Sequence, residues 1–273
     1  PRLSSLFKVA PGDIFKVDGL RTMQQAINAH VESPHLRQLL GRFATYVGAS
    51  PFLAPATLNV IAHVELNQGV WYPQGGIYTI ARALERLARE LGVEIRPNNL
   101  ATSINLRGRR VCGVKLANGE EIPARAVIAN LDVSFVYGRL LPAQPAIRRR
   151  LRRLEGREPS CSGFILLLGV QGEHPELAHH NIFFSSDYPR EFDQIFHLGV
   201  PPEEPTIYVA ISAKSTPSDA PAGCENWFIL VNAPALDRRW DWQAQGEAYA
   251  QRVLYLLAQR GFDLRPGLRY RKA

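Results

Sequence analysis

The residues best suited to chemistry lie in one short segment, Gly69-Val70-Trp71-Tyr72-Pro73-Gln74-Gly75-Gly76, which precedes an amphipathic stretch. Adjacent glycines let a backbone approach a ligand closely, and the start of a helix leaves N–H groups free to bind an anion. Trp71 and Tyr72 could give the same ligand flat apolar contacts. A tight loop held by two packed aromatic side chains explains the segment equally well. The residues alone leave both interpretations open.

A second group of reactive side chains contains three histidines and two glutamates, namely His174, His179, His180, Glu173 and Glu176. Such a set could bind a metal ion, but its spacing does not fix the tetrahedral geometry that a zinc site needs. Histidines that face solvent or pack before a strand are more frequent than metal ligands. We therefore predict no metal site.

Recognisable catalytic motifs are absent from the sequence. It contains no G-x-G-x-x-G, no G-x-x-x-x-G-K-[ST], no G-x-S-x-G and no H-E-x-x-H. Ser160-Cys161-Ser162 offers possible nucleophiles, but no base is identifiable near it. The start of a strand is the favoured interpretation of that tripeptide.

The elements that would position these residues fall into three parts, at 1–74, 75–140 and 141–273. Residues 14–70 read mostly as helix, because apolar residues recur at helical spacing from Leu20 to Phe43. Pro34 suits the first turn of the second helix, where its missing N–H would be unpaired anyway. A third apolar segment, Thr57 to Leu66, closes at Gly69.

The middle part is predicted to be α/β. An apolar stripe from Ile77 to Leu91 has spacings of three and four, which indicates an amphipathic helix. We expect a short strand over Val93–Arg96, and then strands of period two joined by a hairpin at Asn118-Gly119. The apolar run Ala126–Ala129 predicts a strand covered on both faces.

The last part is predicted to be a mostly antiparallel sheet with one closing helix. Short β-branched and aromatic runs separated by turn residues indicate its strands, and an amphipathic helix follows them. The strands are expected over Phe164–Val170, Asn181–Phe184, Ile207–Ser212 and Trp227–Asn232, and the helix over about Ala244–Arg260.

Composition restricts the class of protein. The 273 residues are 46% hydrophobic, enough for one large or two modest cores. No window approaches the roughly 18 consecutive apolar residues of a membrane-spanning helix, and no secretory leader is seen. Three cysteines, far apart, argue against a disulfide framework. We expect a cytoplasmic protein.

The net charge of +7 arises largely from an arginine-rich segment that begins at Pro145. A solvated helix face is the simplest interpretation of such a run. Peripheral binding to an anionic membrane is the next, since basic residues are attracted to its surface. Nucleic acid is not expected, because the run has no interleaved aromatic residues for stacking. The arginines are Arg148, Arg149, Arg150, Arg152, Arg153 and Arg157.

Several segments, taken in order, resemble the bacterial phytoene and carotenoid desaturase family. Each is weak alone, but together they extend from about Ser33 to Arg260. They are Gly69-Val70-Trp71-Tyr72-Pro73-x-Gly75-Gly76, Gly92-Val93-Glu94-Ile95, Ile128-Ala129-Asn130-x-Asp132, Pro159-Ser160-Cys161-Ser162-Gly163-Phe164, Leu177–Phe184, Tyr188–Phe196 and Ala220–Phe228.

The resemblance implies the mixed α/β and α+β fold of amine-oxidase-like flavoproteins. In that fold a discontinuous, Rossmann-like FAD-binding domain is interrupted by a substrate domain of antiparallel sheet and helices. FAD is implied as cofactor, but the family's terminal flavin motifs, including the G-x-G-x-x-G turn, do not occur in this chain. We therefore expect an internal fragment that alone does not hold FAD tightly.

The resemblance also implies which residues serve the cofactor. Gly75 and Gly76 belong to the matching glycine pair. Ala101 takes a position that is commonly Val in the family and contacts the adenine side through its backbone. Asn130 and Asp132 match the stretch that returns towards the flavin.

The activity implied is desaturation, in which two hydrogens leave neighbouring carbons of a carotenoid polyene and a hydride passes to the flavin. An apolar polyene needs a long hydrophobic tunnel, while the cofactor supplies reactivity. Arg37 and Glu65 match polar positions in the family's helical segment and are the candidate catalytic residues. The candidate tunnel residues are Phe43, Trp71, Tyr72 and Phe164, although aromatic residues at such spacing also suit a core.

Two alternatives remain open. One is a carotenoid isomerase or oxygenase of the same flavoprotein superfamily. The other is an inactive fragment that binds lipid or a partner without flavin. The sequence does not indicate an oligomeric state.

Overall fold

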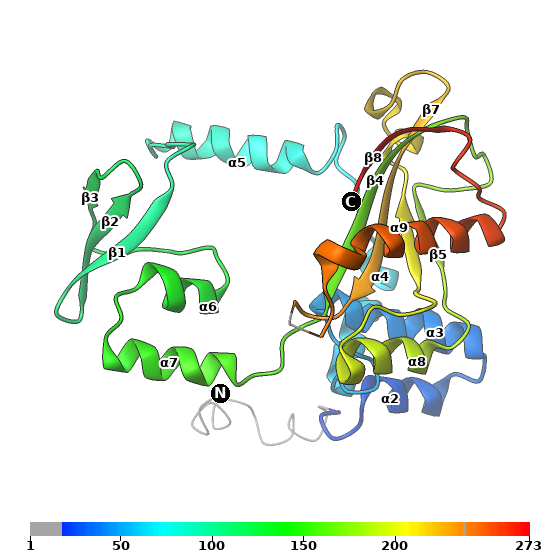
Figure 1. Cartoon of the computed structure of the whole chain (residues 1–273), viewed down its shortest axis with the longest axis horizontal. Helices are drawn as coiled ribbons and strands as arrows, with labels where there is room; N and C mark the ends of the chain where they lie inside the picture. The colour runs from blue at the N-terminus through cyan, green and yellow to red at the C-terminus, as the bar shows by residue number, and fades with distance from the viewer. Residues whose placement is uncertain (1–17, 237–238) are drawn as a thin grey trace. The chain divides into compact units, whose positions relative to one another are not determined.

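A computed structural model describes residues 18–236 and 239–273, and it divides them into two compact units. Unit 1 joins the residues up to Thr79 with those from Ser160 onward, and unit 2 is Ile80–Pro159 (Figure 1). The sequence-based division set its boundaries at 74 and 140, whereas compactness sets them at 79 and 159. Residues 14–17 of the predicted helical region lie outside the described residues.

A five-stranded antiparallel sheet forms the centre of unit 1, in the order β5-β6-β7-β4-β8. Exposure alternates along β7, as expected for a strand whose two faces meet different surroundings. The predicted antiparallel sheet is thus confirmed. Its strands are β4 (Ser162–Gln171), β5 (His180–Phe183), β6 (Ile207–Ala210), β7 (Cys224–Ala233) and β8 (Leu268–Lys272).

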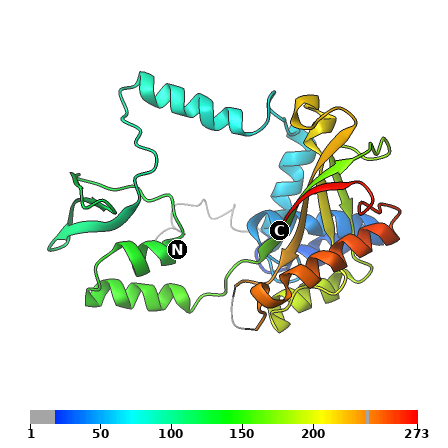
Figure 2. The same ribbon diagram turned by 45° about the horizontal axis from the view of Figure 1, so that its top comes forward.

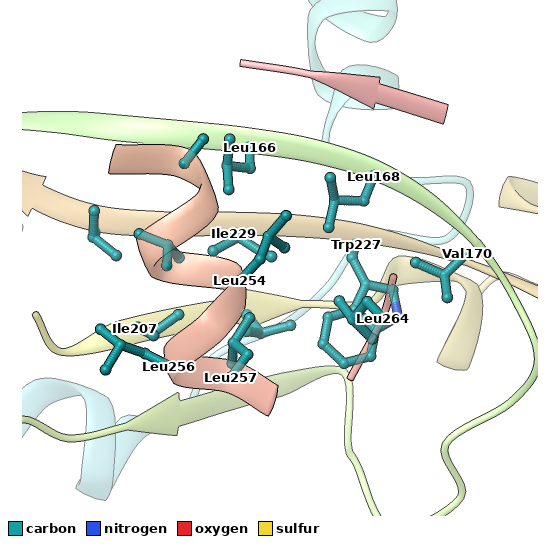
Figure 3. Close-up of a cluster of buried hydrophobic side chains, with 14 of the residues drawn as sticks. Leu166, Leu168, Val170, Ile207, Trp227, Ile229, Leu254, Leu256, Leu257 and Leu264 are labelled. Atoms are coloured by element: carbon teal, nitrogen blue, oxygen red, sulfur yellow. The ribbon is translucent and has the colours of Figure 1, made fainter. Parts of the chain in front are cut away.

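Helix α9 (Trp242–Gln259) covers one face of this sheet and makes the main core with it. Figure 3 shows Leu254 and Leu257 of this helix among Leu166, Ile229 and Trp227 of the strands. Burial of each such side chain stabilises the fold by roughly 1.5–3 kcal/mol. Asp241 fixes the start of α9, because its carboxylate accepts hydrogen bonds from the N–H groups of Gln243 and Ala244.

Short helices cover part of the other face of the sheet. Figure 2 shows them, in blue and cyan, beside the strands. Met23, Ile27, Phe43, Ala44 and Ala62 form their own small core. These helices are α2 (Met23–His30), α3 (Pro34–Gly41), a 3-10 helix over Arg42–Val47, another over Ala56–Leu58, and α4 (Asn59–Gln68); α8 (Tyr188–Asp193) with the π-helical turn Gln194–Leu198 and the 3-10 turns Ser212–Lys214 and Pro217–Asp219 complete the unit.

Unit 2 contains a three-stranded antiparallel meander with helices beside it. The predicted hairpin is confirmed, since β2 and β3 pair around Asn118-Gly119 and Gly119 has a φ of 90°. The elements are α5 (Tyr78–Glu90), which begins in unit 1, β1 (Ala101–Arg107), β2 (Arg110–Leu116), β3 (Glu121–Pro123), α6 (Val133–Phe135), a π-helical turn over Val136–Leu140, and α7 (Pro145–Glu155).

Two strands expected in the middle part are wrong. Val93–Arg96 and Ala126–Ala129 are irregular, and neither pairs with another strand among the described residues. Ile128 is 97% exposed, so the apolar run is not covered on both faces as a buried strand would be. The amphipathic helix α5 forms as predicted, yet Leu84 on its apolar stripe is 61% exposed. Apolar periodicity predicted the helix correctly, but burial of its stripe does not occur within the described chain.

In the described part of the chain, each helix is too short or too polar to cross a membrane.

Candidate functional site

A cavity of about 810 Å³ lies in unit 1, between the helical segment and the sheet face opposite α9. Cys161 N–H donates to the carbonyl of Gly48 at 2.9 Å, which ties the start of β4 to the end of the Arg42–Val47 helix. Gly48 has a φ of 65°, and a Cβ there would approach Ser160 Cβ at 2.7 Å, so a glycine suits this crossing. The cavity is lined by Leu39, Arg42, Phe43, Thr45, Tyr46, Val47, Gly48, Glu65, Val70, Ser160, Cys161, Ser162, Gly163, His180, Ile182, Thr206, Tyr208, Leu230 and Asn232.

Glu65 and Phe43, both predicted site residues, line this cavity together. The Tyr46 hydroxyl donates to a Glu65 carboxylate oxygen at 2.8 Å. Phe43 packs edge-on against the Tyr46 ring, with 5.6 Å between centroids. Burial and the bond to Glu65 raise the pKa of the Tyr46 hydroxyl. Tyr46 therefore remains a hydrogen-bond donor at neutral pH.

Arg42, His180 and Tyr208 add a second polar group to the same cavity. The Arg42 guanidinium lies over the Tyr208 ring, 5.4 Å from its centroid. His180 Nδ1 and the Tyr208 hydroxyl are 2.7 Å apart. Burial raises the pKa of Tyr208, while burial and neighbouring His179 lower the pKa of His180. The pair is thus uncharged at neutral pH, which suits hydrogen bonding to a neutral or polar ligand atom.

Cys161 is the possible nucleophile of the Ser-Cys-Ser tripeptide, and it also lines the cavity. Burial raises the pKa of its thiol. Because the thiolate is the reactive form, Cys161 is a weak nucleophile in this setting. The cavity thus combines apolar side chains with several groups that can form hydrogen bonds.

Arg37, the other predicted catalytic residue, lies elsewhere in unit 1. Its Nε donates to the carbonyl of Val31 at 2.5 Å and its Nη2 to that of Asn28 at 3.4 Å. These carbonyls close the end of α2, so Arg37 acts as a cap of that helix. The structure does not bring Arg37 into the cavity with Glu65.

The three remaining predicted tunnel residues also lie outside the cavity lining. Phe164 faces α9, where its ring stacks on Trp242 with 5.2 Å between centroids. Tyr72 packs edge-on against His179, the neighbour of cavity residue His180, at 4.6 Å. Trp71 is 83% exposed.

Gly75 and Gly76, predicted for the cofactor, form the turn that enters α5. Their φ angles are 78° and 85°, a region that favours glycine. A Cβ on Gly76 would lie 3.4 Å from the Tyr72 hydroxyl. Within this turn the N–H of Gly76 donates to the carbonyl of Pro73, and its carbonyl accepts from Thr79, so the cofactor role of the pair stays a prediction.

Ala101, Asn130 and Asp132, the other predicted cofactor residues, belong to unit 2. Ala101 starts β1, which pairs with β2 on one side and is an edge strand of its sheet, so the predicted backbone contact of Ala101 with an adenine stays a prediction. Asn130 is exposed. Asp132 accepts hydrogen bonds from the N–H groups of Ser134 and Phe135, so its carboxylate caps α6. Backbone contacts to FAD are compatible with these three residues. None of them belongs to a G-x-G-x-x-G motif, which binds the pyrophosphate and does not occur in the chain.

Sequence reasoning missed Arg42, Tyr46, His180 and Tyr208. The signal for the first two was their closeness to Phe43 in the helical segment, because Arg42 directly precedes it and Tyr46 follows it by one turn. His180 was considered only as a metal ligand. Within residues 18–236 and 239–273, no three His, Cys, Asp or Glu side chains converge in a way that could hold a metal ion. The histidines instead contact Tyr208, Ser215 and Glu225.

Curated relatives match almost the whole chain. The chain is 41% identical over 257 residues to a 4,4'-diapolycopene oxygenase of a Methylomonas species, an alignment covering 92% of this chain and 50% of that protein. It is 40% identical to a 4,4'-diaponeurosporene oxygenase of Staphylococcus haemolyticus, covering 93% of this chain and 50% of the relative. The chain therefore spans about half the length of these relatives.

Solved structures and a family pattern agree with this relationship. An oxidoreductase from Methanosarcina mazei superposes with a TM-score of 0.62 at 16% identity, covering 92% of this chain and 54% of that one. A protein from Pyrococcus furiosus superposes with a TM-score of 0.56 at 18% identity, covering 86% of this chain and 54% of that one. These likenesses confirm the predicted fold. The pattern described as flavin containing amine oxidoreductase matches residues 18–164, which implies FAD as the cofactor. Because this match spans more than half of the sequence, the chain belongs to the flavin containing amine oxidoreductase family.

Proposed function

We propose that this chain carries the substrate cavity of an FAD-dependent oxidoreductase that acts on the polyene of a carotenoid. The observation that carries the proposal is the 810 Å³ cavity in unit 1, whose walls combine aliphatic and aromatic side chains with polar ones. Its size falls in the range of small-molecule sites. The names of the two relatives, each an oxygenase of a diapo-type compound, support a substrate of this kind.

FAD, when bound, accepts the electrons removed from the substrate. The chain's own residues would do the rest. In unit 1, the proposed cofactor contacts are the backbone groups of Gly75 and Gly76. In unit 2, they are the edge of β1 at Ala101, together with Asn130 and Asp132. Within the cavity, Glu65 is placed to accept a proton at its carboxylate, and its bond from Tyr46 orients that group.

Two reactions of a polyene suit this site. Desaturation removes two hydrogens from neighbouring carbons, and it is the reaction that the resemblance to carotenoid desaturases favours. Oxygenation of the carbon chain is favoured by the names of the relatives. Desaturation removes hydrogen from the product and oxygenation adds oxygen to it, so product analysis distinguishes the two reactions.

We expect cells that accumulate a linear carotenoid and express this chain joined to the family's terminal flavin motifs, which do not occur in the chain itself, to form an oxidised product that is detectable by absorption and mass spectrometry. A red-shifted product lacking two hydrogens indicates desaturation, and a product with added oxygen indicates oxygenation. Glu65→Gln should lower the yield at least tenfold, because general acid–base groups contribute about 10²–10⁴ in rate. Exposed Glu155→Gln in α7 is the matched control and should leave the yield unchanged.

Unaltered carotenoid would contradict the enzymatic proposal. If the joined protein, once purified, binds the polyene but shows no flavin absorption and forms no product, the result would instead support the alternative of a lipid-binding fragment without flavin.

We further propose that α7 attaches the protein peripherally to an anionic membrane. Ile147, Leu151 and Leu154 are half-buried on one side of this helix, whereas its arginines are exposed. None of Arg148, Arg149, Arg150, Arg152 or Arg153 forms an ion pair with a carboxylate that the structure describes. A dense set of unpaired cations on one helix face suits a surface of anionic lipid.

Reversing three of these charges, Arg149→Glu, Arg150→Glu and Arg153→Glu together, should weaken binding to phosphatidylserine vesicles about a hundredfold or more. The reason is that each basic residue near such a surface contributes about 1 kcal/mol. Vesicle sedimentation at low salt measures this. The same charge change on the exposed hairpin arginines Arg107, Arg109 and Arg110 is the control. Equal loss in both triple variants would show that only net charge matters and would contradict a site on α7.

A further inference from the structure

One cation in the cavity of unit 1 has no obvious purpose in the fold. Arg42 is half-buried and lines the cavity. Within the described ranges 18–236 and 239–273, no carboxylate forms an ion pair with it. A charged group withdrawn from water without an ionic partner is costly, so its retention calls for a compensating contact.

The contacts that Arg42 does make leave most of its donors unused. Its guanidinium lies over the face of the Tyr208 ring, a contact that uses the π-system and not the N–H groups. It also lies close enough to Tyr46 to affect the pKa of that hydroxyl. Glu65 lines the same cavity, but its carboxylate accepts the Tyr46 hydroxyl at 2.8 Å. A guanidinium has five N–H donors in a planar fork, and such a fork suits carbonyl and carboxylate oxygens.

The surroundings of Arg42 indicate what such an oxygen would be attached to. Leu39, Phe43, Val47, Ile182 and Leu230 give the same cavity apolar walls. The tyrosine hydroxyls and His180 that share it are uncharged at neutral pH, as described above. The cavity thus combines apolar side chains with one cation that interacts with Tyr46 and Tyr208 and keeps further N–H donors for a ligand, which fits an apolar molecule that carries a polar oxygen.

We propose that Arg42 binds the oxygen of an oxidised end group, a carbonyl or carboxylate, on a polyene whose apolar chain occupies the cavity. This inference rests on the proposed function and makes it more specific. Arg42 is then a specificity-determining residue, and the chain prefers polyenes that already carry an oxygen at one end over plain hydrocarbons.

Three polyenes that differ only in one end group test the proposal: all-trans-retinoic acid, all-trans-retinal and the hydrocarbon axerophthene. The 273-residue chain is titrated with each in the same detergent, and binding is followed by polyene absorption and fluorescence. The acid and the aldehyde should bind at least tenfold more tightly than the hydrocarbon. Arg42→Met should abolish that preference and leave hydrocarbon binding unchanged, which also shows that the variant retains a folded cavity.

Two further variants make the result specific to the guanidinium. Arg42→Lys keeps the charge but not the fork and should retain part of the preference for the acid. Arg190→Met removes an exposed arginine that is paired with Glu203 and should behave as wild type. Equal affinity for all three polyenes would overturn the role of Arg42 while leaving a polyene cavity. Failure of all three to bind would overturn both this role and the proposed function of the cavity.

Discussion

Replacing Glu225 with alanine is expected to lower the free energy of unfolding by about 3–5 kcal/mol, the cost of breaking a buried ion pair by removing one partner. Glu225 is buried on β7, and Lys214 Nζ lies 2.6 Å from its Oε1. His174 Nδ1 and Trp227 Nε1 lie 2.8 and 2.9 Å from its Oε2. The backbone N–H of His174 also donates to Oε1 at 3.0 Å. Alanine would leave the half-buried Lys214 ammonium without its anionic partner, although it still donates to the carbonyl of His174 at 2.7 Å, and it would leave the N–H donors of His174 and Trp227 without this acceptor.

The pKa of Glu225 explains why the charged form matters. Burial alone would raise it, but the hydrogen bonds from His174, Lys214 and Trp227 lower it to about 2. The folded state therefore releases this proton more readily than the unfolded chain. The resulting stabilisation is complete above the unfolded pKa of a glutamate and is lost as the pH falls towards about 2.

Urea unfolding at neutral pH, followed by circular dichroism, measures the effect of Glu225→Ala. Glu247→Ala is the matched control, because Glu247 pairs with Arg271 at 2.8 Å but its side chain is 69% exposed. Exposed ion pairs contribute about 0–1 kcal/mol. If Glu225→Ala lowers the free energy of unfolding no more than Glu247→Ala does, the result would contradict a stabilising role for the buried network.

The elements with a clear period could be predicted from sequence. Strand β7 and helix α9 bury one face each, so apolar residues recur at spacings of two and of three to four. The strand expected at Ala126–Ala129 was wrong. An apolar run predicts a buried strand only where other helices or strands cover it, and Ile128 of this run is exposed. Local sequence carries no information about that cover.

The candidate site was harder to predict, because its residues meet through tertiary packing. Glu65 and Phe43, predicted through a resemblance, line the cavity, whereas Arg37 from the same segment caps α2. Phe164 was predicted to line the substrate tunnel, but its side chain lies on the α9 face of the sheet. Successive residues of a strand point to opposite faces, so an error of one position changes the face that a side chain meets. Arg42 has no sequence motif, and its partner Tyr208 is far away along the chain.

A second buried glutamate should make stability depend on pH in the opposite sense to Glu225. Glu191 on α8 is buried, and it accepts hydrogen bonds from the N–H and the hydroxyl of Thr206 at 3.0 and 2.6 Å. Burial raises its pKa to about 7 despite these bonds and the proximity of Arg42. Between the ordinary glutamate pKa of 4.5 and about 7, the folded protein keeps a proton that the unfolded chain has lost. The free energy of unfolding therefore falls as the pH rises through this window.

The expected loss from Glu191 alone is roughly 3 kcal/mol between about pH 5 and pH 8, since each pKa unit corresponds to about 1.4 kcal/mol. Glu191→Gln should remove this dependence, because an amide can bond both Thr206 groups and does not titrate. The difference in unfolding free energy between wild type and Glu191→Gln, measured in urea across that range, isolates the contribution from other ionisable groups. Exposed Glu176→Gln is the control. A difference in unfolding free energy that does not change with pH would contradict the buried-acid account.

The same titration connects to the cavity, because Thr206 both bonds Glu191 and lines the cavity that holds Arg42. When Glu191 is protonated, Arg42 has no nearby buried anion and its donors are available to a ligand oxygen. When Glu191 loses its proton, the new negative charge attracts the guanidinium and competes with that oxygen. Retinoic acid should therefore bind wild type less tightly at about pH 8 than at about pH 6, whereas Glu191→Gln should bind it equally at both. Equal pH dependence in the two proteins would show that Glu191 and Arg42 act independently.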